Sequence, residues 1–130
     1  ELLDDQRTQL IDKVKTLLLE KVQTGEFPDQ FSIVKFIGSS MHRDYSAISK
    51  LFTAVEGITI EQYFILLKIE KVKELLVYNE LNLSEIAFQL GYSSVSYLSN
   101  QFKRVTGMNP STFKQSHSVQ RKMLYHLHSH

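Results

Sequence analysis

The chain contains the same phrase twice, and this internal repeat constrains its fold more than any other feature. "SKLFTAVEGITIEQY" covers residues 49–63, and "SNQFKRVTGMNPSTF" covers residues 99–113, fifty positions later. The two stretches share a serine, a phenylalanine, a valine and a glycine at matching places: Ser49/Ser99, Phe52/Phe102, Val55/Val105 and Gly57/Gly107. Such self-similarity predicts two copies of one structural unit. The shared residues are then its scaffold, and the polar residues that differ form the faces that the scaffold presents.

Helical signals dominate around both copies. Residues 4–24 carry apolar side chains at a period of 3.6, and the two prolines lie outside the periodic segments. Four helices are expected to start at clear signals, which are the N-caps Asp44 and Ser94 and the capping boxes Thr59–Gln62 and Asn82–Glu85. No segment has the pattern of a strand. The sequence therefore predicts an all-α fold with about seven helices.

Each copy has the order short helix, tight turn, longer helix and glycine stop, which is the helix-turn-helix arrangement. In the second copy Gly91 permits the positive φ of the turn, while Leu98 and Phe102 anchor the longer helix to the core. In the first copy Phe52 is an anchor, but His42 stands where the second copy has glycine, so the geometry of its turn stays open. We therefore expect two helix-turn-helix subdomains joined by a long linker helix.

The expected organisation has five segments. They are an amphipathic N-terminal helix and its connection, packed on the first subdomain (1–31), the first helix-turn-helix (32–58), the linker helix (59–80), the second helix-turn-helix with a closing helix (81–116) and a mobile C-terminal tail (117–130). A linker roughly 30 Å long can hold two helices about one turn of DNA apart, roughly 34 Å.

The linker helix also carries three lysines, Lys68, Lys71 and Lys73, which lie among glutamates and are expected to form a solvated face. Because the chain starts at Glu1 rather than Met, we expect an upstream part to be missing.

Composition excludes several classes of function. The absence of cysteine removes disulfides and thiolate zinc sites and is typical of a cytoplasmic protein. No apolar run approaches the roughly 20 residues that span a bilayer, so we expect no membrane partner. Serine, histidine and aspartate occur without a nucleophile–base arrangement, so we expect neither an enzyme nor a cofactor. His126, His128 and His130 invite a metal interpretation, but no acidic or cysteine partner accompanies them, and we expect no metal.

The exposed faces of the two longer helices are the candidate functional surfaces. A helix fits the major groove of DNA, where base edges can be distinguished. With a net charge of only +1, a polyanion such as DNA must be met by a local patch. The outward residues are Tyr45, Ser46, Ser49 and Lys50 in the first copy and Val95, Ser96, Ser99 and Asn100 in the second. Tyr45 can instead pack on the first helix.

Residues 83–114, "LSEIAFQLGYSSVSYLSNQFKRVTGMNPSTFK", carry a family signature. They hold I-A, then G-Y-S, then S-Y-L-S, then F-K, a glycine, and a proline followed three residues later by an aromatic. This stretch resembles the DNA-binding domain of the AraC/XylS family of bacterial transcription regulators. The resemblance continues through "KIEKVKELL", similar to the family's linker helix, and back to about Leu10. It implies two helix-turn-helix subdomains on one face of a DNA duplex, and a separate ligand-sensing or dimerising domain.

The resemblance also implies roles for individual residues. The family's base-reading positions fall on Ser46, Ser49 and Lys50, and on Val95, Ser96, Ser99 and Asn100, with Tyr45 beside them. By chemistry, Lys50 can donate to guanine, Asn100 can pair with adenine, and Val95 can touch a thymine methyl. Phosphate contacts are expected from Arg43, Ser94, Lys103 and Arg104.

The sequence thus predicts sequence-specific binding of double-stranded DNA, with RNA polymerase as a further partner and a homodimer formed through a domain absent from this chain. Two alternatives remain. A degenerate helix-turn-helix array can serve as a protein–protein interaction module, which the low net charge and the serine-rich faces permit. A metal-responsive domain that uses the C-terminal histidines is the other.

Overall fold

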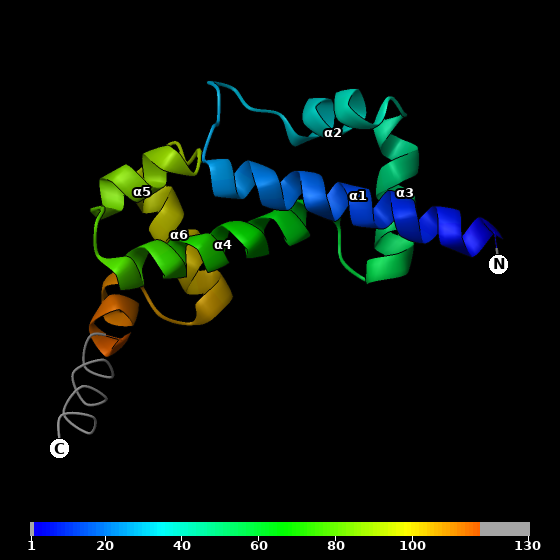
Figure 1. Cartoon of the computed structure of the whole chain (residues 1–130). Coiled ribbons are helices and arrows are strands. Elements are labelled where there is room, and N and C mark those ends of the chain that lie inside the picture. Colours follow the sequence, from blue (N-terminus) through cyan, green and yellow to red (C-terminus); the bar gives the residue numbers. More distant parts are fainter. Residues whose placement is uncertain (1, 118–130) are drawn as a thin grey trace, which may run out of the picture. The chain divides into compact units, whose positions relative to one another are not determined.

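The computed structural model describes residues 2–117 of the chain, with side chains from residue 5 (Figure 1). Its helices are α1 (Leu2–Thr24), α2 (Ile33–Met41), α3 (Tyr45–Glu56), α4 (Ile60–Tyr78), α5 (Leu83–Gln89) and α6 (Val95–Thr106), and residues 110–117 are also helical. The described residues contain no strand, so the predicted all-α fold class is confirmed. None of the helices in this part of the chain is long and apolar enough to cross a membrane.

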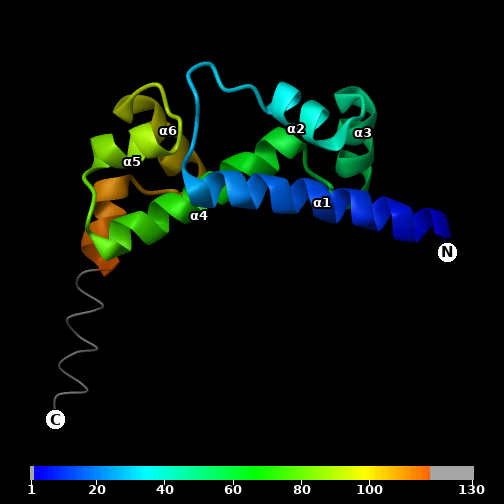
Figure 2. The same cartoon turned by 45° about the horizontal axis from the view of Figure 1, so that its top comes forward.

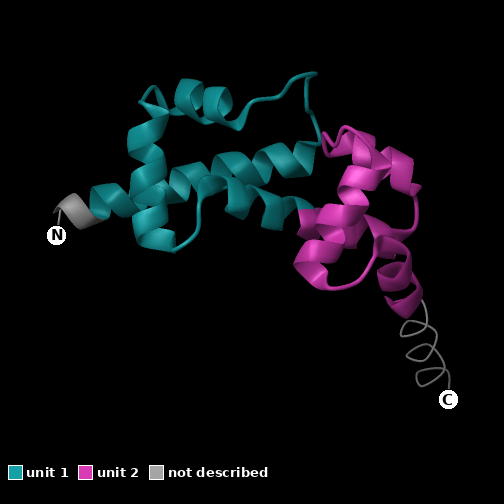
Figure 3. Cartoon of the chain, turned by 180° about the vertical axis from the view of Figure 1, so that it is seen from behind, with its two compact units in different colours: residues 1–68 teal, residues 69–130 magenta. Residues whose placement is uncertain are grey.

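The chain divides into two compact units, Glu1–Lys68 and Ile69–His130, and the division falls inside α4 (Figure 3). The first unit contains the helix-turn-helix formed by α2 and α3, and the second contains the one formed by α5 and α6. The two expected copies are therefore present, one in each unit, with the linker helix contributing residues to both.

The core of the first unit forms where α1 packs on α2 and α3, which lie on the same side of α1 in Figure 2. The inward residues of α1 repeat at helical spacing, and each is at most 2% exposed: Ile11, Val14, Leu18 and Val22. From α3 the buried anchors are Ile48 and Phe52, and the Phe52 ring meets the edge of Tyr63 at 5.5 Å between centroids. The shared phenylalanine of the repeat is thus a core residue.

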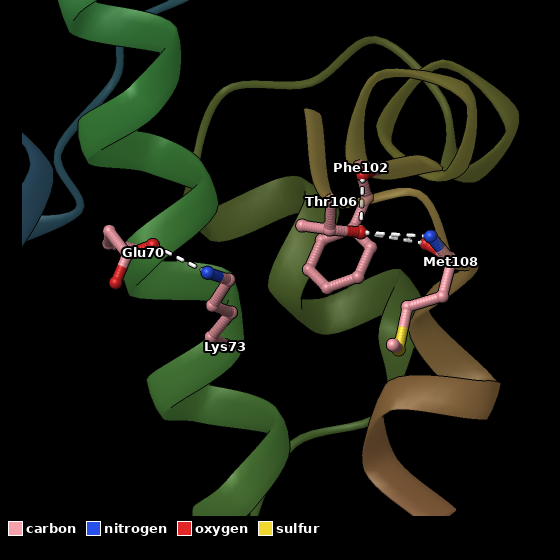
Figure 4. A network of polar contacts seen from close by, with 5 residues as sticks. All are labelled: Glu70, Lys73, Phe102, Thr106 and Met108. Carbon is pink, nitrogen blue, oxygen red and sulfur yellow. Dashed lines mark hydrogen bonds and ion pairs between the residues drawn. The ribbon is translucent and has the colours of Figure 1, made fainter. Parts of the chain in front are cut away.

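The second unit repeats this plan. Leu98 and Phe102 of α6 are fully buried, and Phe102 meets the Phe113 ring edge-on at 5.6 Å. After α6 the chain turns at Gly107, and the Thr106 hydroxyl holds this turn (Figure 4). It donates to the Phe102 carbonyl at 2.8 Å and accepts from the Met108 N–H at 3.2 Å. The longer helix of this copy is therefore fixed at its end as well as along its buried side.

The three lysines of α4 do not share one environment. Lys73 pairs with Glu70 at 2.7 Å, as Figure 4 shows, and Lys71 pairs with Glu74 at 3.4 Å. Both lysine side chains are nevertheless half-buried, 33% exposed for Lys73 and 17% for Lys71, so the solvated face that the sequence predicts is formed mainly by the two glutamates. For Lys68 the expectation is wrong, because its ammonium group lies over the Phe64 ring at 5.3 Å and is largely buried.

The two turns start with the same backbone geometry, although α3 begins three positions after His42 and α6 begins four positions after Gly91. His42 and Gly91 both adopt a left-handed conformation, with φ of 53° and 75°. The next N–H reaches back in the same way, from Arg43 to the Gly38 carbonyl at 3.3 Å and from Tyr92 to the Ala87 carbonyl at 2.9 Å. The turn geometry that the sequence left open is thus settled, and the first copy achieves it without glycine.

The N-caps of the longer helices differ in strength. In the second copy the Ser94 hydroxyl accepts from the Tyr97 N–H at 3.1 Å. In the first copy Asp44 occupies the cap position, but its side chain makes no capping hydrogen bond. The expectation that Asp44 caps α3 is therefore right for the position and wrong for the interaction. Both capping boxes, at Thr59–Gln62 and Asn82–Glu85, are confirmed.

Replacing His42 with glycine is expected to stabilise the first unit by about 0.5–1 kcal/mol. Glycine relieves the strain of a residue with a Cβ in the left-handed conformation, and the greater entropy that glycine loses on folding offsets part of this gain. The His42 side chain is exposed, so little packing is lost. Urea unfolding measures the change. The matched control is Gly57→Ala, which should destabilise by about 1 kcal/mol because φ there is 81° while a Cβ would meet nothing within 4 Å. A destabilised His42→Gly variant would contradict this account.

Candidate nucleic-acid interface

The exposed faces of α3 and α6 follow one pattern of burial. Along residues 44–50 and 94–100 the sequence of exposed, half-buried and buried positions is identical. In each helix one anchor is buried, which is Ile48 or Leu98. The eight expected base-reading residues divide in the same way: Ser46, Lys50, Ser96 and Asn100 are exposed, and Tyr45, Ser49, Val95 and Ser99 are half-buried. Each unit therefore presents four of them along one longer helix.

Tyr45 differs from the other seven because its hydroxyl is engaged within the first unit. It donates to a carboxylate oxygen of Glu61 on α4 at 2.8 Å. The pKa of the Tyr45 phenol is raised, mainly by burial and to a smaller extent by this hydrogen bond. The phenol therefore ties the start of α3 to α4, which leaves the tyrosine ring rather than its hydroxyl for another partner.

The expected phosphate-binding residues are all exposed, namely Arg43, Ser94, Lys103 and Arg104. Arg43 borders a hollow of about 460 Å³ in the first unit, which is also lined by Gln6, Gln9 and Lys13 of α1. Lys103 and Arg104 lie in the last turn of α6, where cations favour the negative end of the helix dipole. The structure thus adds Lys13 to the cations near the first copy.

Comparison with known proteins identifies the family. Residues 38–116 match the family model described as a helix-turn-helix domain. Over 108 residues the chain is 32% identical to the HTH-type transcriptional activator RhaR of Salmonella dublin, an alignment that covers 83% of this chain and 36% of RhaR. The chain is an AraC/XylS-type DNA-binding domain. It belongs to a family of transcription regulators, not of enzymes, and it spans about a third of the length of the curated relatives that it matches.

Solved structures share the fold of this AraC-type domain. The C-terminal domain of AraT, a response regulator from Geobacillus stearothermophilus, has a TM-score of 0.71 and 20% identity, covering 82% of this chain and 84% of that one. The DNA-binding domain of AdpA, crystallised with a target DNA, has a TM-score of 0.73 and 20% identity, covering 86% and 96%. At these identities the likeness shows the fold of the AraC-type domain and not its contacts.

Sequence reasoning missed Tyr97, whose side chain is 56% exposed on α6. Tyr97 belongs to the S-Y-L-S signature, and the sequence analysis assigns it no contact. The repeat itself holds the missing signal, because the matching residue of the first copy is Ala47, and positions that differ between copies belong to the surface. An AraC-type signature residue is thus also a surface residue in this chain.

Metal ligands do not gather in the described part of the AraC-type domain. No three histidine, cysteine, aspartate or glutamate side chains among residues 5–117 converge on a point that could hold an ion. The expected tail and its His126, His128 and His130 lie almost wholly outside the described residues, which end at 117. The absence of a metal therefore stays a prediction for the histidines of the tail.

Proposed function

We propose that this AraC-type domain binds double-stranded DNA sequence-specifically, with α3 and α6 entering successive major grooves. The observation that carries the proposal is the identical pattern of exposed and half-buried residues on these two helices. Each helix is held by its buried phenylalanine and offers its outer face to a partner. The proposal places the two units on one face of the duplex, with α4 as the linker.

Three residues are proposed to supply most of the sequence preference. Lys50 is proposed to donate to guanine O6 or N7, Asn100 to pair with adenine, and Val95 to contact a thymine methyl. The serines are proposed to contact bases with little discrimination, which are Ser46, Ser49, Ser96 and Ser99. Tyr45 is proposed to contribute through its ring, because its hydroxyl already donates to Glu61.

Phosphate contacts are proposed to supply most of the affinity. With a net charge of +1, attachment depends on the local cations Arg43, Lys103 and Arg104, together with Ser94 at the start of α6. For each phosphate that the protein neutralises, log K of binding falls by about 0.9 for every tenfold rise in salt concentration. Binding that weakens steeply with salt is therefore expected, and a flat salt response contradicts the proposal.

The test is a selection of bound duplexes from a random library at about 0.15 M salt. Two enriched blocks about 10 base pairs apart are expected, one for each helix. Lys50→Ala and Asn100→Ala should each weaken binding to the selected duplex about 5- to 100-fold and relax preference within one block, since a good base contact discriminates by about 1–3 kcal/mol. Lys71→Ala is the matched control, because that lysine pairs with Glu74 on α4. If a variant that carries both Lys50→Ala and Asn100→Ala keeps the same base preference, the assignment of these two residues as base readers is refuted.

RNA polymerase is the proposed further partner, a homodimer through a part of the protein outside this chain is the proposed assembly, and the cytoplasm is the proposed location. RhaR is named a transcriptional activator, which supports the first of these by kinship. The protein–protein interaction module remains as a second candidate, because Phe88 on α5 is 86% exposed. A selection that enriches no duplex, with binding insensitive to salt, would favour that candidate.

A further inference from the structure

One side of α6 carries a small hollow that the base-reading residues only partly use. The hollow has a volume of about 150 Å³ and is lined by Tyr97, Asn100, Gln101 and Arg104, which are helical neighbours at spacings of three and four. At about 30 Å³ for a water molecule in the liquid, this is room for about five water molecules. A phosphate group, whose five heavy atoms are bonded to one another, occupies less than this and therefore fits in the hollow.

Gln101 forms a wall of this hollow and is fixed in place. It is 6% exposed, and no other polar or charged residue in the described part of the chain is counted as buried. The amide oxygen accepts a hydrogen bond from the Tyr92 hydroxyl at 2.5 Å. Burial raises the pKa of the Tyr92 phenol, so this group stays a donor at neutral pH. With its oxygen engaged, the amide has its N–H groups to offer to another partner.

Tyr97 forms the outer wall and is supported from one side. Its ring lies 5.9 Å from the buried Tyr92 ring, centroid to centroid, at an angle of 48°. More than half of the side chain is nonetheless exposed. The contact with Tyr92 limits the positions of the Tyr97 ring, so less entropy is lost when a partner holds this side chain at the wall of the hollow.

The lining of the hollow has the chemistry of an anion site. It offers one guanidinium, two amides and one phenol, and no carboxylate is among the lining residues. Arginine, asparagine, glutamine and tyrosine are all side chains that contact DNA phosphates. Charge-assisted hydrogen bonds from a guanidinium to a phosphate oxygen are among the stronger kind.

The first copy has nothing equivalent on α3. At the positions that match Tyr97, Gln101 and Arg104 it carries Ala47, Leu51 and Ala54, none of which can donate a side-chain hydrogen bond. Within the repeat, these three positions change together from apolar to donor. Because the first copy lacks these donors, any function of the hollow belongs to the second copy alone.

We propose that Tyr97, Gln101 and Arg104 form a binding site for one DNA backbone phosphate beside α6, with Asn100 at its border. This inference rests on the proposed DNA binding and adds to it a site that fixes the register of α6 on the strand. Tyr97 and Gln101 become DNA-contacting residues. Asn100 lines the hollow and is also the proposed reader of adenine. The phosphate contact and the base contact therefore come from the same part of α6.

The experiment measures binding of the complete 130-residue chain to its selected duplex and to an unrelated duplex over a range of salt. Tyr97→Phe keeps the ring and its contact with Tyr92 but removes the hydroxyl, and it should weaken binding to both duplexes alike, by about 2- to 10-fold. Arg104→Gln should lower the salt slope by about 0.9, and Arg104→Lys should restore it. Tyr78→Phe is the matched control, because it removes the hydroxyl of a tyrosine on α4 that is similarly exposed, 62% against 56%, and it should change nothing. Thermal unfolding checks that each variant remains folded.

Three results would overturn the inference. If Tyr97→Phe and Arg104→Gln bind as the unchanged protein does while Lys50→Ala and Asn100→Ala lose binding, the hollow holds no phosphate although the proposed function stands. If Tyr97→Phe alters the preferred base pair, Tyr97 reads a base instead. If the unchanged protein selects no duplex, the proposed function fails and the phosphate site fails with it.

Discussion

Replacing Phe102 with alanine is expected to destabilise the second unit by about 3–5 kcal/mol, the cost of removing a fully buried aromatic ring. The Phe102 side chain is 0% exposed and meets Phe113 edge-on. Its removal leaves a cavity between α6 and the helix over residues 110–117, and an aromatic pair adds about 0.5–1.5 kcal/mol to what burial alone contributes. Such a loss is a large part of the whole stability of a small domain.

Amide hydrogen exchange under native conditions, together with urea unfolding, measures this effect for each unit. Protection should fall in α5 and α6 for Phe102→Ala, and in α2 and α3 for the matching Phe52→Ala, because the two phenylalanines lie in different units. Phe88→Ala is the control for the loss of a ring, since Phe88 is 86% exposed and its removal should cost less than about 0.5 kcal/mol. If Phe102→Ala costs no more than Phe88→Ala, the shared phenylalanine is not the anchor described above.

Much of this fold can be predicted from the sequence because its signals are local. The capping boxes at Thr59 and Asn82 need only residues three positions apart, and both are formed. The glycine stops at Gly57 and Gly107 need only the freedom of one residue to adopt a positive φ. The repeat then supplies the one long-range fact, that the second helix-turn-helix is built as the first one is.

The features that could not be predicted depend on contacts between residues distant in sequence. The hydroxyl of Tyr45 reaches Glu61, sixteen residues on, and no local pattern marks that bond. Arg43 lines a hollow together with side chains of α1 only because α1 packs on the first copy. Tyr97 is a different case, because its signal is local: it differs from Ala47, the residue at the matching position of the first copy. The assignments of base and phosphate contacts stay predictions.

Lys68 is the clearest of these long-range effects, because its place in a run of charged residues on α4 indicates a solvated side chain. In the structure it lies beside Phe64, four residues earlier on α4, and beside Phe27 from the segment between α1 and α2. Its ammonium group is 5.3 Å from the Phe64 ring centroid and 6.0 Å from that of Phe27. Burial lowers the pKa of Lys68 from 10.5 to about 8. The charged form is therefore less favourable in the folded protein than in the unfolded chain.

This pKa predicts that stability rises with pH between about 8 and 10.5. Below pH 8 Lys68 is protonated in both states and the full cost of its burial is present. Above pH 8 the folded protein releases this proton while the unfolded chain still holds it, so the unfolded state binds more protons and folding becomes more favourable. At about 1.4 kcal/mol per pKa unit, the whole window contributes about 3 kcal/mol.

Lys68→Met should remove this dependence and stabilise the protein by up to about 3 kcal/mol at pH 7, since methionine keeps the length of the side chain without its charge. Part of that gain is offset by the lost cation–π contacts, which are worth about 0.5–2 kcal/mol. Urea unfolding at a series of pH values measures the difference between the variant and the unchanged protein, in which the other titrating groups cancel. Lys73→Met is the control on the same helix, because Lys73 pairs with Glu70 near the surface. If the unchanged protein and Lys68→Met show parallel curves above pH 8, Lys68 is as well solvated in the folded protein as its sequence environment indicates.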